Sequence, residues 1–255
     1  MLITSRSNTK IKHLRALGQR KARLASGEFV LAGLGLLQEA QAAGYRLHQL
    51  FCLPDIADTP AARSLQAAEY YTLPEELMSY AAQQPSAPKA LGVLALKQPA
   101  EDKNRRRGWL LTESLQDPGN FGALLRLADA MGWRGILTLG DAPDPFQPKV
   151  LRGSMGSALR LPVQSLTLDA LARWQADGWQ LVGTCLDASV SSLRWQAPEK
   201  MILALGHEGQ GLSPELLALC QQRIRIPMSG AVDSLNVATA AAMLVHEALR
   251  QWENP

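Results

Sequence analysis

The segment MILALGHEGQGLSPELLALCQ, residues 201–221, contains the alternation of elements that decides the fold. Its apolar start predicts a strand over residues 200–205 that is buried on both faces. Ser213 followed by Pro214 is typical of an N-cap and the first turn of a helix, which we expect over residues 214–221. The loop between these two elements has three glycines and can wrap a ligand with its main chain.

The same alternation extends over the rest of the chain from Gly108. Apolar runs predict further strands, and helical spacing predicts further helices, with the strands over residues 109–112, 136–139, 180–184 and 223–226 and the helices over 121–131 and 235–252. Strands that alternate with helices usually form parallel sheets. We therefore expect an α/β domain in which helices cover both faces of a parallel sheet.

The first hundred residues predict a smaller α/β unit. Asn8 and Thr9 are a helix start signal, and the apolar spacing behind them extends to Leu24. Gly44 is placed to close a helix over residues 34–43. Short strands are expected over residues 29–31, 47–53 and 93–96.

A polar segment, KQPAEDKNRRR at residues 97–107, separates the two regions. Its proline and dense charge are typical of a linker. We therefore expect a small α/β domain over residues 1–96, a linker over 97–107 and a second domain over 108–255.

Composition excludes several classes of protein. The 255-residue chain has a mean hydropathy of -0.07 and no apolar run near the length of a membrane span. The cysteines (Cys52, Cys185 and Cys220) and the four histidines are scattered, which argues against a disulfide framework and against a metal site. These features predict a globular, cytoplasmic protein with no membrane and no metal partner.

Basic residues crowd the start of the chain, and no acid precedes Glu28. They are Arg6, Lys10, Lys12, Arg15, Arg20, Lys21 and Arg23. Clustered cations suggest an anionic partner, so we expect these residues to contact RNA phosphates, together with residues 105–107 of the linker. A solvated helix face is one alternative. A transit peptide is another, and it is disfavoured because the pattern continues into a predicted strand.

Polar residues of unusual type follow three of the predicted strands. They comprise the turn Asp117-Pro118-Gly119-Asn120 with Arg126 on the next helix, Glu208 within the glycine loop, and Asp233, Ser234 and Asn236 at the start of the last helix. Ligands bind at the carboxyl ends of parallel strands, so these side chains could share one site. Each also has a simpler explanation as part of a turn or as a helix cap.

Three stretches of this region occur in a fixed order near the C-terminus: NFGALLR at 120–126, LGHEGQGLS at 205–213, and IPM at 226–228 with DSLNVA at 233–238. Together they resemble the three motifs of the SpoU (TrmH-like) family of RNA 2′-O-ribose methyltransferases, in the SPOUT superfamily. The resemblance covers residues 108–252. The opening SRSNTKIKHLR, residues 5–15, is similar to the small RNA-binding domain of the same family.

Two positions depart from the family pattern. His207 stands where the second motif usually has asparagine, and Ala32 stands where an acid usually precedes Gly33. The histidine could change hydrogen bonding or pH dependence at the site. Ala32 lies in the RNA-binding region, so it bears on the identity of the target.

The resemblance implies a fold and a cofactor. The fold is an α/β domain whose parallel sheet contains a deep C-terminal trefoil knot, paired with a second copy as a homodimer. The cofactor is S-adenosyl-L-methionine, held in the knot mainly by backbone groups. The positions that match the family's cofactor contacts are Thr184, Gly206, Ile226, Met228 and Leu235.

The implied reaction is methyl transfer from the sulfonium to a ribose 2′-hydroxyl of RNA. The matching catalytic positions are Asn120, Arg126, Glu208, Ser234 and Asn236. A guanidinium rarely releases its proton, so we expect Arg126 to clamp the target phosphate and stabilise the developing alkoxide. Glu208 would pair with Arg126, the two asparagines would orient the substrate and hold the loops, and Ser234 would supply a loop or hydroxyl contact.

The nature of the RNA is open at this point. The basic opening resembles family members that act on large-subunit RNA, which favours ribosomal RNA over tRNA. Methylation of tRNA is an alternative, and so is a non-catalytic RNA-binding protein that keeps the fold. The presence of Asn120, Arg126, Glu208 and Asn236 argues against the non-catalytic alternative, because binding alone does not need them.

Overall fold

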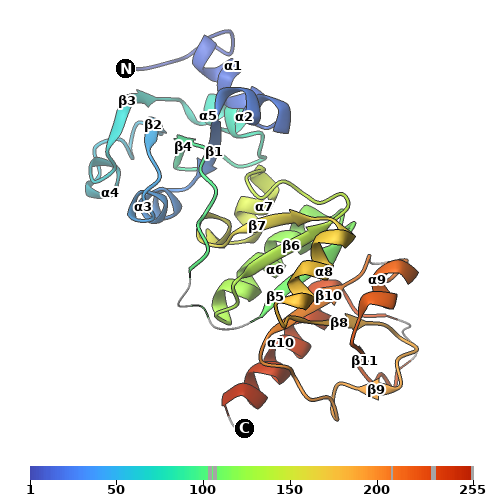
Figure 1. The fold of residues 1–255 in the computed structure, drawn as a ribbon. Helices are drawn as coiled ribbons and strands as arrows, with labels where there is room; N and C mark the ends of the chain where they lie inside the picture. Colours follow the sequence, from blue (N-terminus) through green and yellow to red (C-terminus); the bar gives the residue numbers. More distant parts are fainter. Residues whose placement is uncertain (103–104, 106–107, 208, 231–233, 254–255) are drawn as a thin grey trace. The chain divides into compact units, whose positions relative to one another are not determined.

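The structure is a computed structural model, and it describes residues 1–102, 105, 108–207, 209–230 and 234–253 (Figure 1). The chain forms two compact units. Unit 1 consists of Met1–Gln98 and Phe146–Leu159, and unit 2 consists of Pro99–Pro145 and Arg160–Pro255. No helix among the described residues is long and apolar enough to cross a membrane.

Unit 1 has a four-stranded sheet in the order β1-β4-β2-β3. Its strands are β1 (Glu28–Ala32), β2 (Leu47–Cys52), β3 (Ala67–Thr72) and β4 (Ala90–Ala95). Strand β4 pairs antiparallel with β1 and β2, whereas β2 and β3 are parallel. The helices of this unit are α1 (Thr9–Ala16), α2 (Arg20–Ser26), α3 (Leu34–Ala42), α4 (Pro60–Arg63), α5 (Glu75–Ala82) and α7 (Pro148–Gly153), and a 3-10 turn, η1, covers Ser157–Leu159.

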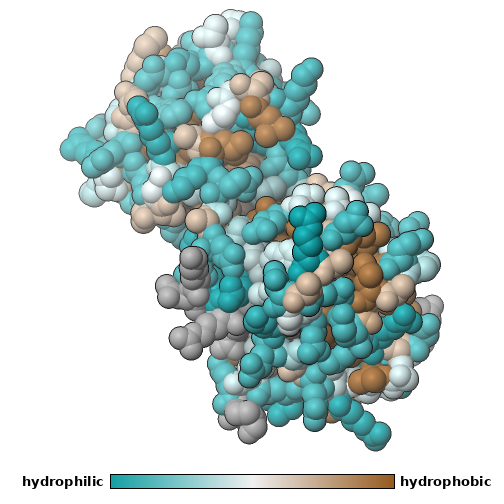
Figure 2. Space-filling model, viewed as in Figure 1, coloured by the Kyte–Doolittle hydropathy of each residue, from teal (hydrophilic) through white to brown (hydrophobic). Residues whose placement is uncertain are grey.

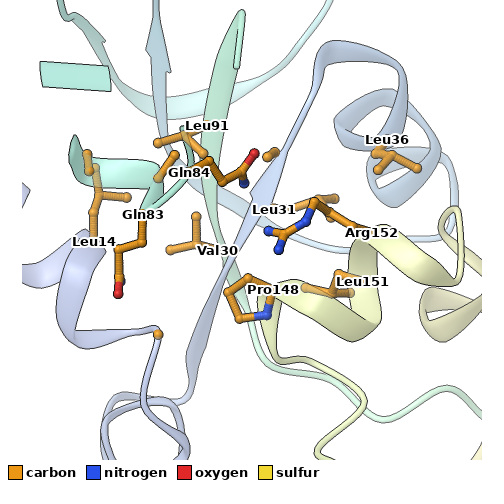
Figure 3. Close-up of a pocket in the computed structure, with 14 residues that line it drawn as sticks. Leu14, Val30, Leu31, Leu36, Gln83, Gln84, Leu91, Pro148, Leu151 and Arg152 are labelled. Atoms are coloured by element: carbon orange, nitrogen blue, oxygen red, sulfur yellow. The ribbon is translucent and has the colours of Figure 1, made fainter. Parts of the chain in front are cut away.

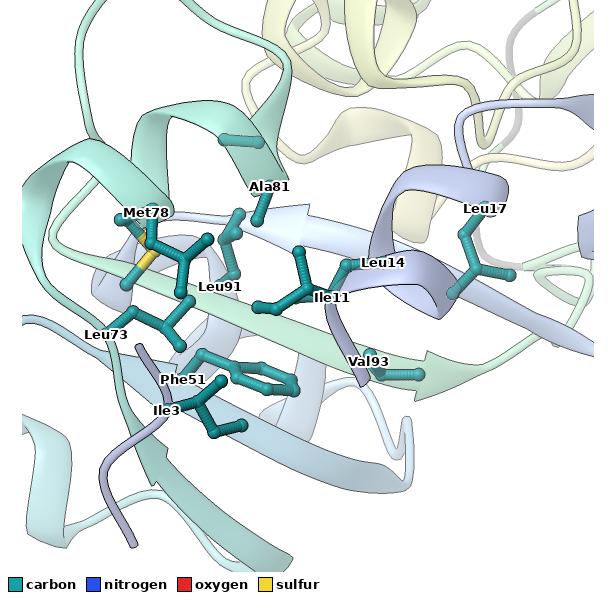
Figure 4. Close-up of a cluster of buried hydrophobic side chains, with 12 residues drawn as sticks. Ile3, Ile11, Leu14, Leu17, Phe51, Leu73, Met78, Ala81, Leu91 and Val93 are labelled. Carbon is teal, nitrogen blue, oxygen red and sulfur yellow. The ribbon is translucent and has the colours of Figure 1, made fainter. Parts of the chain in front are cut away.

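The start of the chain packs by the predicted pattern as far as the end of α1. Asn8 caps α1 by accepting from the Lys10 N–H at 2.8 Å, and Ile11 and Leu14 join the core between α1, α5 and the sheet (Figure 4). The expected continuation to Leu24 is wrong. The helix stops at Ala16 and α2 begins anew, so Leu24 is 62% exposed.

Residues 146–159 belong to unit 1, although the sequence places them within the second domain. The Phe146 ring packs against Phe29 with centroids 4.9 Å apart. The Tyr45 hydroxyl donates to the Leu159 carbonyl at 3.2 Å, and α7 packs against β1. Unit 1 is therefore completed by a segment from between two strands of unit 2, a long-range contact that no local pattern reveals.

Unit 2 contains the expected parallel sheet with seven strands in the order β7-β6-β5-β10-β8-β11-β9. Among the described residues, every pair of neighbouring strands in this sheet is parallel. The strands are β5 (Trp109–Glu113), β6 (Gly135–Leu139), β7 (Val163–Leu166), β8 (Gln180–Thr184), β9 (Val190–Ser191), β10 (Met201–Leu205) and β11 (Gln222–Arg225).

Helices cover both faces of this sheet, as the alternation predicts. Trp109 of β5 and Ile202 of β10 point into a core with Leu171 of α8 (Leu168–Ala176) and Leu216 of α9 (Pro214–Leu219). On the other face, α6 (Pro118–Ala130) packs against β6 and against α10 (Val237–Glu253) (Figure 1). Strand β10 lies between β5 and β8, which places its carboxyl end and the glycine loop at the centre of one sheet edge.

At Arg105 the linker is bound to the rest of unit 2. Arg105 donates to the Asp129 carboxylate on α6 at 2.6 Å, and Arg160 contacts the other oxygen of Asp129 at 2.8 Å. Contact of Arg105 with RNA stays a prediction, and its ion pair with Asp129 gives the guanidinium a role within the protein as well. Arg106 and Arg107 lie outside the described residues.

Candidate functional site

A cavity of about 600 Å³ lies at the carboxyl ends of β8, β10 and β11, beside the start of α10. It is lined by all the positions expected to contact the cofactor: Thr184, Gly206, Ile226, Met228 and Leu235. Ser234 lines it as well. Residues that are up to 51 positions apart in the chain thus meet in one pocket because parallel strands end at the same edge.

The glycine loop forms one wall of this cavity. A Cβ on Gly206 would lie 2.1 Å from the carbonyl carbon of Gly211 and 2.4 Å from the Leu212 nitrogen, so no side chain fits there. His207 and Gly211 exchange two backbone hydrogen bonds of 2.9 Å each. The wall is therefore bare main chain, which a ligand can approach closely.

The unusual His207 takes part in this loop through its ring. The ring Nδ1 accepts the Gly209 N–H at 3.1 Å. That hydrogen bond uses Nδ1 as the acceptor. The residue that departs from the family pattern thus takes part in the loop's own hydrogen bonding.

Apolar side chains line most of the cavity, among them Leu205, Leu212, Ile226 and Leu235. The Thr184 hydroxyl is already engaged, since it donates to the Ala204 carbonyl at 3.0 Å. A largely apolar pocket with a few converging polar groups is the usual form of a small-molecule or cofactor site.

A second hollow, within unit 1, is far smaller (Figure 3). Its volume is about 30 Å³, and it lies among Leu14, Val30, Leu91 and Leu151. That space suffices for one or two water molecules and excludes a nucleotide-sized ligand.

Asn120 and Asn236 are brought together from the starts of two helices. The Asn236 amide donates to the Asn120 side-chain oxygen at 2.9 Å. The Asn236 oxygen accepts the N–H groups of Ala238 and Thr239 at 3.0 and 3.3 Å, so Asn236 caps α10. The helix begins later than the sequence predicts, so Asn236 caps it in place of Ser234. Asp233 lies outside the described residues.

Arg126 projects from α6 into solvent. Among the described residues its guanidinium makes no hydrogen bond or ion pair, and Arg126 is not among the residues that line the cavity. The expected pairing with Glu208 remains a prediction, since Glu208 lies outside the described residues. A solvent-facing cation near the site is free to meet an anionic substrate.

Sequence patterns assign no role to Glu113, which contacts the end of the glycine loop without lining the cavity. Glu113, the last residue of β5, accepts the Ser213 N–H at 2.7 Å on one carboxylate oxygen and the Ser213 hydroxyl at 2.6 Å on the other. The signal was an acid placed directly after a buried apolar run. Its partner, 100 residues later, could be found only from the fold.

The basic residues of the N-terminal region fall into distinct environments. Arg6, Lys12, Arg20 and Lys21 are exposed. Lys10 is partly buried and ion-paired with Glu69 at 2.6 Å. The Arg15 guanidinium lies 4.0 Å from the centroid of the Tyr80 ring.

Arg23 does not fit the expected phosphate-binding surface. Its side chain is buried, and its guanidinium donates to the carbonyls of Leu17 and Gly18 at 2.8 and 3.0 Å. These bonds hold the turn between α1 and α2. RNA contact by Arg23 stays a prediction, and the burial of its side chain argues against it.

A carboxylate flanked by two histidines lies in unit 1. Glu28 hydrogen-bonds His13 Nε2 at 2.7 Å and His48 Nδ1 at 2.5 Å. Burial raises the pKa of Glu28, but the hydrogen bonds from His48 and His13 outweigh that effect and hold its pKa below the ordinary value.

Comparison with known proteins places this arrangement in a family. The model of the SpoU rRNA Methylase family matches residues 109–246, which include the cavity and all of its lining residues. The chain belongs to the SpoU rRNA methylase family. A second model, the MRM3-like substrate binding domain, matches residues 8–92 in unit 1.

Relatives of this SpoU protein match over nearly the whole chain. An uncharacterised tRNA/rRNA methyltransferase of Synechocystis is 36% identical over 98% of this chain and 93% of its own. The Bacillus subtilis 23S rRNA (guanosine(2553)-2′-O)-methyltransferase RlmP is 30% identical over 96% of this chain and 97% of its own. The crystal structure of an AdoMet-bound rRNA methyltransferase from Sinorhizobium meliloti superposes with a TM-score of 0.84 at 28% identity, over 98% of this chain and 97% of that chain.

Proposed function

We propose that this protein transfers the methyl group of S-adenosyl-L-methionine to a ribose 2′-hydroxyl of ribosomal RNA. The observation that carries the proposal is the cavity itself, which unites every position expected to contact the cofactor in a chain of the SpoU family. Its relatives named 23S rRNA 2′-O-methyltransferases match this chain over both units, which supports ribosomal RNA as the substrate class.

The residues present fit this cofactor. The cavity's volume of about 600 Å³ falls within the range of cofactor sites. Its apolar walls suit a purine ring. Gly206 lets the loop close on itself at Gly211 and Leu212, where a Cβ would clash with the loop's own backbone. When bound, the cofactor supplies an electrophilic methyl group on a sulfonium.

Transfer requires a 2′-hydroxyl aligned in line with that methyl group and loss of the hydroxyl proton. We assign Arg126 to the target phosphate and to the negative charge that develops on the 2′-oxygen, because a guanidinium is a permanent cation and a poor base. Asn120 and Asn236 hold the starts of α6 and α10 at the site through their 2.9 Å hydrogen bond. Ser234 offers a hydroxyl in the cavity, and Glu208 is proposed to position Arg126.

Unit 1 is proposed to bind the RNA. The match to a substrate binding domain supports this role, as do the exposed cations Arg6, Lys12, Arg20 and Lys21 with Lys10 and Arg15 beside them. Exposed Lys and Arg side chains bind phosphates chiefly by releasing counterions, so affinity should fall steeply with salt.

Three further properties belong to this proposal. The sheet of unit 2 contains a deep trefoil knot, the protein acts in the cytoplasm, and it pairs as a homodimer through unit 2. The small residues Ala238 and Ala242, one turn apart on α10, permit close helix packing, and Met243 is 50% exposed. These features support a helix contact between copies.

Label transfer tests the proposal. Purified protein is incubated with methyl-labelled S-adenosyl-L-methionine and RNA from cells that lack the modification, and the RNA is then fractionated. We expect label in ribosomal RNA. Label confined to tRNA would show that tRNA is the substrate and would overturn the assignment to ribosomal RNA. Binding of RNA without binding of the cofactor would show instead that the protein is a non-catalytic RNA-binding protein.

A further inference from the structure

Glu113 occupies an unusual position at the edge of the unit 2 sheet. It is the last residue of β5 and lies opposite Leu139 of β6. The next residue, Ser114, has a φ of +49°, in the left-handed region that non-glycine residues rarely adopt. The chain thus turns away sharply behind Glu113, and strained backbone of this kind concentrates at functional sites.

The carboxylate of Glu113 makes a two-pronged contact. One oxygen accepts the Ser213 N–H at 2.7 Å, and the other accepts the Ser213 hydroxyl at 2.6 Å. Both bonds are short, partly buried and charge-assisted, and such bonds are stronger than those between neutral groups. Two simultaneous bonds fix the orientation of Ser213 as well as its distance from β5.

This contact closes the glycine loop onto a single strand. The loop begins after Leu205, which pairs with Thr112 of β5, and it ends at Ser213, which is bound by Glu113. Two consecutive residues of β5 therefore hold the two ends of the loop. Between them lies the main-chain wall of the cavity, including Gly206 and Leu212.

We infer that Glu113 is a positioning residue for the cofactor site, which sets the affinity for S-adenosyl-L-methionine by holding the glycine loop in place through Ser213. Glu113 is not among the residues that line the cavity, so it acts on the cofactor only through the loop. The inference rests on the proposed function, since it takes the cavity as the cofactor site.

The test is equilibrium binding of S-adenosyl-L-methionine to the Glu113→Gln variant, measured by calorimetry without RNA. Glutamine keeps the shape but replaces one acceptor with an NH2 donor, so one Ser213 donor loses its partner. We expect the Kd of the cofactor to rise by about tenfold or more. KM for the cofactor should rise in parallel, whereas kcat at saturating cofactor and the affinity for RNA should change much less.

Glu215→Gln is the matched control. Glu215 is an exposed acid in the first turn of α9, two residues from Ser213. Its substitution makes the same charge change and leaves the two hydrogen bonds between Glu113 and Ser213 in place. Its cofactor affinity should equal that of the parent protein. A loss of affinity in both variants would assign the effect to net charge and overturn the inference.

Ser213→Ala removes the hydroxyl that donates to Glu113, and it replaces Glu113→Gln as the test if that variant fails to fold. The Kd of the cofactor should rise in Ser213→Ala. The Kd of the double variant should exceed that of Glu113→Gln only by the small effect of losing the α9 cap. Parent-like binding by folded Glu113→Gln, or by Ser213→Ala, overturns the inference. Failure of the parent protein to bind the cofactor would instead overturn the proposed function.

Discussion

At the scale of single residues, we assign cofactor binding and stabilisation of the reaction to different side chains. The cofactor positions line the cavity, whereas Arg126 lies on the exposed side of α6 and is not among the lining residues. This division predicts that the two functions can be lost independently.

Arg126→Ala should abolish detectable methyl transfer, lowering kcat by at least about 10²–10³-fold, because the developing oxyanion loses its charged donor. The Kd of S-adenosyl-L-methionine should stay within about twofold. Single-turnover transfer and calorimetric binding measure the two quantities. Equal loss of both would refute the division of labour.

The Asn120–Asn236 pair allows capping and coupling to be measured separately. Asn236→Asp keeps an acceptor for the Ala238 and Thr239 N–H groups but has no amide to donate to Asn120. It should retain the parent's stability and lose activity. Asn236→Ala should lose activity and also about 1 kcal/mol of unfolding free energy, read from denaturant curves. A fully active Asn236→Asp would show that the contact between the two helices has no role in the reaction.

Glu28 predicts a pH dependence of stability in unit 1. Its pKa is lower in the folded protein than its ordinary value of 4.5, so its ionised form stabilises the fold above that pH. The contribution is lost as the pH falls through the folded-state pKa. Glu28→Gln should therefore be less stable than the parent near neutral pH, and the gap should narrow on acidification. A gap that stays constant down to about pH 3 would contradict the assignment.

At the scale of elements, burial decides which parts of the fold the sequence reveals. The strands β5, β6, β8 and β10 are predicted within a residue or so, because each is a compact apolar run in the middle of the sheet. The strands β3, β7 and β9 escape prediction, since they are short or half-exposed and lack such a run.

Long-range partners explain most of the remaining differences. The sequence predicts Arg23 to be a surface cation. In the structure it donates to the carbonyls of Leu17 and Gly18, and no local pattern shows that these carbonyls need a donor. Glu113 looks like an ordinary loop acid because its partner is distant in the chain. The motif residues of the cavity were predictable because a family resemblance supplies long-range information that local patterns lack.

The segment 146–159 leads to a prediction about the element packing of unit 1. Val150, Leu151 and Phe146 are buried there, so a fragment of residues 1–98 alone leaves apolar surface of β1 uncovered. That fragment should unfold at lower denaturant concentration than one in which residues 146–159 are joined to it by a flexible linker. Circular dichroism measures both midpoints, and equal midpoints would show that the segment adds nothing to unit 1.

At the scale of the whole molecule, we propose that unit 1 binds RNA and that unit 2 holds the cofactor and carries the chemistry. Most of the surface on the face shown in Figure 2 is hydrophilic. Under this proposal, substitution of the exposed cations of unit 1 should change RNA affinity with little effect on cofactor binding, and cavity substitutions in unit 2 should do the reverse.

Lys21 and Arg23 test this view as a matched pair of neighbouring cations. Lys21→Gln should weaken RNA binding and lower the slope of log affinity against log salt by about one, without changing the melting temperature. Arg23→Gln should lower the melting temperature, because buried carbonyls lose a charged donor. Filter binding over a salt series and thermal melts give the two readouts. An Arg23→Gln variant with the parent's melting temperature and weakened RNA binding would show that Arg23 contacts RNA.

We propose that the methyl group goes to a ribose oxygen of ribosomal RNA. The most direct test digests the labelled ribosomal RNA to nucleosides and identifies the labelled species by mass spectrometry. We expect a 2′-O-methyl nucleoside, with label absent when Arg126→Ala replaces the parent protein. Label on a nucleobase would contradict the proposed reaction, since the cofactor site would then serve methylation of a base.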